Sequence, residues 1–82
     1  MTKSVFTSQQ KQLQTLLRQI RLEAGIRQAD VAQRLGQPQS FVSKYESGVR
    51  RLDLVELRQV CKAVGVSLEA FIRRFEESIH EA

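Results

Sequence analysis

Four side chains that form hydrogen bonds stand close together in the middle of the sequence. They are Gln39, Ser40, Ser43 and Lys44. On a helix with this spacing, Val42 and Tyr45 face the protein interior and the four polar groups face outward. A protein-binding surface more often carries aromatic and aliphatic anchors, whereas amide and ammonium groups can hydrogen-bond to the edges of DNA bases. This outward set favours DNA as the ligand.

The two parts of the chain carry net charges of opposite sign. Residues 1–52 contain nine Lys and Arg against three Asp and Glu, a net charge of +6, and residues 53–82 contain four against six, a net charge of −2. A basic region suits a polyanionic partner, because neutralised phosphates release condensed counterions. Basic surfaces also simply keep soluble proteins in solution, so charge alone leaves both interpretations open.

The elements that hold these side chains are predicted to be helices. Each of the four glycines, at positions 25, 36, 48 and 65, follows a stretch with helical apolar spacing, where a left-handed C-terminal residue favours glycine. The pattern predicts five helices: over residues 8–24, over residues 28–35, from residue 39, after residue 53 and after residue 67. The predicted fold class is all-α, a compact five-helix domain with a central helix-turn-helix.

Capping residues support these predicted boundaries. The expected caps are Thr7 with Gln10 for the first helix, Pro38 in the first turn of the third, Asp53 with Glu56 for the fourth, and Ser67 for the fifth. The predicted domain covers residues 8–79, with residues 1–7 as a flexible N-terminal segment and residues 80–82 as a C-terminal tail.

Residues 28–45 have the spacing of a helix-turn-helix, with two short helices separated by residues 36–38. Ala32 lies where the two helix axes cross closely, so a larger side chain there would push the helices apart. The contacts expected to hold the second helix at a fixed angle come from Val31, Leu35, Val42 and Tyr45.

The sequence resembles the phage repressor and Cro type of helix-turn-helix, also called XRE-like, over residues 16–75. The matching text is Leu17-Arg-Gln-Ile-Arg, Ala24-Gly25-Ile26, Gln28-Ala-Asp-Val-Ala-Gln-Arg-Leu-Gly36, Gln39-Ser-Phe-Val-Ser-Lys-Tyr-Glu-Ser-Gly48 and Ala63-Val-Gly-Val-Ser-Leu68. A chance helical bundle would rarely reproduce this pattern in order.

The resemblance implies a role for each matching residue. Base-reading positions correspond to Gln39, Ser40, Ser43 and Lys44. Phosphate contacts are expected from Arg27, Gln28, Ser47, Arg50 and Arg51. An ion pair between Arg21 and Glu46 would tie the first helix to the end of the recognition helix. The chain departs from the family where Arg27 and Pro38 replace hydroxyl caps and where the loop over residues 49–53 lacks the usual proline.

The last predicted helix carries more apolar residues than one face of a final helix normally needs. We expect Ile72, Phe75 and Ile79 to form a homodimer contact, which would place two recognition helices on a near-palindromic operator. The same side chains could instead only complete the core of the monomer.

Other classes of function find little support in the sequence. The sequence contains no catalytic nucleophile paired with a general base and no Gly-rich phosphate loop, so nothing indicates an enzyme or a cofactor. One Cys with one His is too few for a zinc site. No segment resembles a membrane span or a secretory signal, so the expected location is cytoplasmic. Cys61 is assigned to the core, and Phe41 is expected to pack at the edge of the domain rather than to contact a thymine methyl group.

The alternative function is a protein-interaction module of the same fold, an antitoxin or adaptor with an unidentified protein partner.

Overall fold

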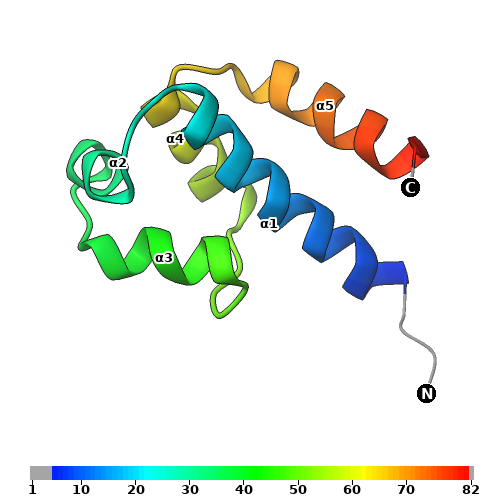
Figure 1. Ribbon diagram of the computed structural model, residues 1–82, viewed down its shortest axis with the longest axis horizontal. Coiled ribbons are helices and arrows are strands. Elements are labelled where there is room, and N and C mark those ends of the chain that lie inside the picture. The colour runs from blue at the N-terminus through cyan, green and yellow to red at the C-terminus, as the bar shows by residue number, and fades with distance from the viewer. Residues whose placement is uncertain (1–4, 82) are drawn as a thin grey trace.

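The computed structural model describes residues 5–81, which form five helices and no strand (Figure 1). The helices are α1 Val5–Glu23, α2 Gln28–Leu35, α3 Gln39–Ser47, α4 Leu54–Val64 and α5 Leu68–Glu81. The predicted all-α class with five helices is therefore confirmed. In Figure 1, α1 crosses the molecule with α3 on one side and α5 on the other, and α1 contacts both.

The two ends of the chain are more helical than the sequence predicts. Since α1 begins at Val5, Thr7 and Gln10 lie inside the helix and the predicted capping box is wrong. No Gly or Pro precedes Thr7 to stop the helix, and threonine costs only a fraction of a kcal/mol inside one. Part of the expected N-terminal segment is thus helical, and α5 extends through residues 80 and 81 of the expected tail. Residues 1–4 and 82 lie outside the described residues.

The predicted caps of α4 and α5 agree with the structure, whereas Pro38 lies one position ahead of its predicted place. Asp53 Oδ1 accepts the Glu56 amide at 2.7 Å and Glu56 Oε1 accepts the Asp53 amide at 2.9 Å, a reciprocal capping box at the start of α4. Ser67 Oγ accepts the Ala70 amide at 3.0 Å and caps α5. Pro38 stands directly before α3 in extended conformation, one position ahead of the first turn.

The turn between α2 and α3 depends on Gly36. Its φ of +66° lies in the left-handed region, where a side chain would be strained. The amide of Gln37 then donates to the carbonyl of Ala32 at 3.0 Å, which closes the end of α2. Ala32 itself is 3% exposed, as expected for the point where α2 and α3 cross.

One apolar core joins all five helices. Its most deeply buried large side chains are Val31, Val42, Val60, Cys61 and Phe71. Core residues from α1 to α5 meet in this single cluster, so α3 is held by packing as well as by polar contacts. The prediction that Cys61 belongs to the core is confirmed.

Candidate nucleic-acid interface

The outward face of α3 carries the four polar side chains singled out by the sequence. Gln39, Ser40 and Lys44 are exposed, and Ser43 is half-buried. Ser43 Oγ donates to the carbonyl of Ser40 at 3.2 Å, so this hydroxyl is turned back toward its own helix and offers lone pairs to a ligand. The opposite face of α3 is buried through Val42 and Tyr45.

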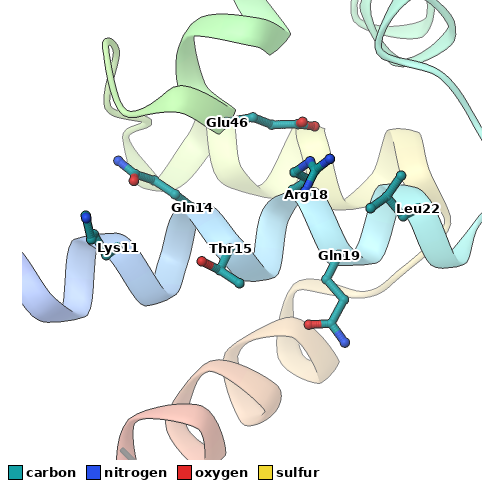
Figure 2. A pocket seen from close by; sticks show the side chains of 7 residues that line it. All are labelled: Lys11, Gln14, Thr15, Arg18, Gln19, Leu22 and Glu46. Carbon is teal, nitrogen blue, oxygen red and sulfur yellow. The ribbon is translucent and has the colours of Figure 1, made fainter.

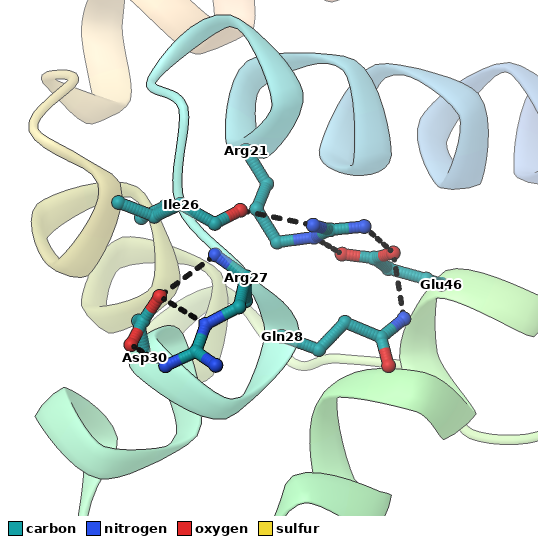
Figure 3. Close-up of polar contacts among 6 residues, drawn as sticks. All are labelled: Arg21, Ile26, Arg27, Gln28, Asp30 and Glu46. Atoms are coloured by element: carbon teal, nitrogen blue, oxygen red, sulfur yellow. Dashed lines mark hydrogen bonds and ion pairs between the residues drawn. The ribbon is translucent and has the colours of Figure 1, made fainter.

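Glu46, in the last turn of α3, fixes the position of this helix (Figure 3). Its carboxylate accepts two hydrogen bonds from the guanidinium of Arg21, at 2.7 Å from Nε and 3.0 Å from Nη2. The side chains of this pair are 9% and 4% exposed, and Arg21 also donates to the carbonyl of Ile26 at 3.0 Å. The Glu46 hydrogen bonds raise the pKa of Arg21 despite its burial, so the guanidinium stays protonated. The structure thus contains the ion pair implied by the resemblance.

Gln28, at the start of α2, joins the same network. Its Nε2 donates to Glu46 Oε1 at 3.1 Å, which ties α2 to α3 beside the Arg21 contact (Figure 3). An amide nitrogen carries two hydrogens, so one donor of Gln28 is left for an external acceptor. The side chain is half-buried and prealigned rather than free to rotate.

Arg27 precedes α2 where the family commonly has a hydroxyl cap. A guanidinium has no acceptor and cannot cap a helix, and Asp30 compensates by accepting the Arg27 amide at 2.9 Å. The Asp30 carboxylate also binds the Arg27 guanidinium at 3.2 Å from Nε and from Nη2. These bonds lower the pKa of Asp30. Sequence reasoning missed Asp30, although an acidic residue three positions after a cap is a known signal.

The loop after α3 places its two arginines in different surroundings. Arg50 donates to both carboxylate oxygens of Glu56, at 3.1 and 2.6 Å, and its guanidinium lies over the ring of Phe41. The Arg51 side chain is exposed and makes no hydrogen bond or ion pair with the described residues. Of the two arginines in this loop, only Arg51 therefore presents an unpaired charge. Ser47 is exposed, with its Oγ donating to the carbonyl of Lys44 at 3.2 Å.

The sequence that forms these helices matches a known family. The model of a helix-turn-helix family matches residues 17–71, from the second half of α1 to the first turn of α5. This chain belongs to the XRE-like helix-turn-helix family. No curated protein sequence matches the chain significantly.

Two solved structures resemble the whole fold. An XRE-family like protein from Pseudomonas syringae pv. tomato str. DC3000 is 39% identical, with 90% of each chain covered and a TM-score of 0.85. The restriction-modification controller protein C.Esp1396I, as a tetramer in complex with its natural 35 base-pair operator, is 25% identical, with 94% of this chain and 97% of that chain covered and a TM-score of 0.81.

A groove on this helix-turn-helix protein was not predicted from the sequence. It runs along α1 next to the end of α3 and is lined by Lys11, Gln14, Thr15, Arg18, Gln19, Leu22 and Glu46 (Figure 2). Lys11 and Arg18 are exposed and have no ion pair with other described residues. The charge of Glu46 is compensated by Arg21, so the groove is electropositive. Gln14 also lies against Gly48, where an added Cβ would overlap its amide.

The described residues contain neither a metal-binding cluster nor a membrane-spanning helix. Between residues 5 and 81, no three His, Cys, Asp or Glu side chains gather where a metal ion could bind. None of the helices in that part of the chain is both long enough and apolar enough to span a bilayer.

Proposed function

We propose that this protein is a sequence-specific regulator of transcription that binds double-stranded DNA as a homodimer and inserts α3 into the major groove. The observation that carries the proposal is the polar face of α3 on a helix anchored by Glu46 to both α1 and α2. A reading helix must be rigid, because base discrimination depends on a few hydrogen bonds of fixed geometry. The controller protein in complex with its operator supports the same use of the fold.

The residues divide into those that read bases and those that position the protein. Bidentate contact with adenine suits Gln39, and donation to guanine suits Lys44, with Ser40 and Ser43 beside them. Positioning on the phosphates falls to Gln28 through its remaining donor, to Ser47 and to Arg51. Arg27 contributes less charge, because Asp30 neutralises its guanidinium.

Phosphate contact extends along α1 in this proposal. Lys11 and Arg18 line the electropositive groove, which Glu46 also lines at the end of α3 (Figure 2). Each contact would add one released counterion to the binding equilibrium.

Dimerisation through α5 completes the proposal. Phe75 packs partly against the monomer core, whereas Ile72 is 39% exposed and Ile79 is half-buried, three residues on one face of the helix. An isologous contact through this face would present two α3 helices to half-sites about 34 Å apart on near-palindromic DNA.

Selection of bound fragments from random duplex DNA, followed by affinity measurements on single-base variants, tests the function. We expect Gln39→Ala and Lys44→Ala to relax specificity at particular base pairs, at a cost of about 1 to 3 kcal/mol each. Base preferences that survive both substitutions unchanged would show that α3 is not the reading helix.

A protein-interaction role is a second candidate, supported by a different surface. Val49, Leu54 and Val55 are 75%, 66% and 70% exposed around the loop and the first turn of α4. Adjacent exposed apolar side chains are typical of protein contacts. If the selected DNA pool shows no enrichment, this interpretation takes precedence over DNA reading.

A further inference from the structure

Three side chains stack between α3, the following loop and α4. The Arg50 guanidinium carbon lies 4.6 Å from the centre of the Phe41 ring, within the range of a cation–π contact. The same guanidinium makes the two hydrogen bonds to Glu56 already described and donates to the carbonyl of Arg51 at 3.0 Å. All of the Arg50 contacts are thus within the protein.

Both ends of this stack are fixed. Phe41 meets Tyr45 edge to face, with ring centres 5.7 Å apart at 79°, and Tyr45 is 2% exposed in the core. Glu56 is held by the capping box with Asp53 in the first turn of α4. The Arg50 guanidinium lowers the pKa of Glu56, so this pair is charged at neutral pH. Arg50 therefore links the recognition helix to a rigid point on another helix.

We propose that Arg50 is a positioning residue, which sets the angle of α3 against α4 through Phe41 and Glu56, and that it is not a phosphate ligand. This inference rests on the proposed function. A planar guanidinium can stack on a ring and donate two parallel hydrogen bonds at once. A phosphate would have to displace Glu56 and draw the guanidinium off Phe41, whereas Arg51 needs no such exchange.

Arg50→Lys separates the two roles, because lysine keeps the charge but cannot stack flat or donate two parallel hydrogen bonds. Operator and non-operator duplexes are titrated at several salt concentrations with Arg50→Lys, Arg50→Ala and Arg51→Ala. We expect both Arg50 variants to lose about tenfold in operator preference with an unchanged salt slope. Arg51→Ala is expected to keep the preference and to reduce the slope by about one. The proposal is wrong if Arg50→Lys binds like the wild type while Arg50→Ala reduces the salt slope.

Glu56→Gln provides a second test that preserves the fold. The amide oxygen of glutamine can still accept the Asp53 N–H, so the cap of α4 is retained while the charge is lost. If Arg50 positions α3, Glu56→Gln is expected to lose operator preference as Arg50→Lys does. If Glu56 instead restrained a phosphate ligand, releasing Arg50 would raise both affinity and salt slope, and the proposal would be wrong.

The stack is also measurable without DNA. In the free protein, ring current from Phe41 is expected to shift the Arg50 side-chain NMR signals upfield, and Phe41→Leu to remove the shift. Unshifted signals in the wild type contradict the stack itself. If the stack is present but the wild type binds every duplex equally, the proposed function fails, and the positioning role of Arg50, which rests on it, fails with it. With wild-type preference intact, the Arg50 and Glu56 variants decide the positioning role alone.

Discussion

Glu46 is the residue on which the placement of α3 depends most directly, because it accepts hydrogen bonds from both Arg21 and Gln28. We expect Glu46→Gln to destabilise the fold by about 3 kcal/mol, since Arg21 would keep its charge at 8% exposure without a carboxylate. Urea denaturation at pH 7 measures the change. The exposed Glu76→Gln is the matched control and is expected to have almost no effect; equal effects in the two variants would show that the pair contributes nothing specific.

Cys61 offers a second prediction for a single residue. Burial in the core raises the pKa of its thiol to about 11, and the side chain is 0% exposed. Because the thiolate is the reactive form, a thiol reagent at pH 8 is expected to modify the folded protein at least about a hundred times more slowly than the urea-unfolded chain. Rapid modification under native conditions would indicate that the core opens readily.

At the level of elements, α1 has two functions in this proposal: it packs against α3 and it lines the electropositive groove. Arg18→Ala is expected to weaken binding to operator and non-operator DNA alike and to reduce the salt slope by about one. The matched control is Arg73→Ala, which removes the same charge from an exposed side chain of α5. Helix α5 lies on the other side of α1 from α3 (Figure 1). Equal slopes in the two variants would mean that the groove does not contact DNA.

At the level of the whole molecule, the dimer can be tested more cleanly through Ile72 than through Phe75. Phe75→Glu would also disturb the monomer core, whereas Ile72 is largely outside it. We expect Ile72→Glu and Ile79→Glu to sediment as folded monomers that bind the operator weakly. Val55→Glu, at a 70% exposed apolar site on α4, is the control for an added charge. Folded Ile72→Glu that remains dimeric excludes this face.

The pH dependence of stability also belongs to the whole fold, because an ion pair joins α5 to α1. Arg74 donates to both carboxylate oxygens of Glu23, at 2.8 and 3.0 Å, and lowers the pKa of Glu23. A carboxyl whose pKa is lower in the folded state stabilises that state above its unfolded pKa, near 4.3, and loses this contribution as pH falls through the folded value. Thermal melts between pH 7 and pH 2 are therefore expected to show less acid destabilisation for Glu23→Gln than for wild type. An identical pH profile would indicate that the pair is too exposed to contribute.

Local sequence signals determined the helices, most of their caps and the family. The spacing of Val42 and Tyr45 against the polar residues of α3 is a property of one helix, so it could be read without the fold. Glycine at positive φ and the reciprocal Asp53 and Glu56 cap also act within a few residues. The start of α1 was missed because a capping residue and an ordinary helical threonine look alike when nothing before them stops the helix.

Only the tertiary structure decided which charged side chains have partners inside the protein. Glu56 forms an ion pair with Arg50, whereas Arg51 stays exposed, although the two arginines are neighbours of the same type. Lys11 and Arg18 meet the end of α3 in one groove, although they are far from it in sequence. Ion pairs and cation–π contacts depend on distances of a few ångströms between helices, which residue spacing within one helix does not specify.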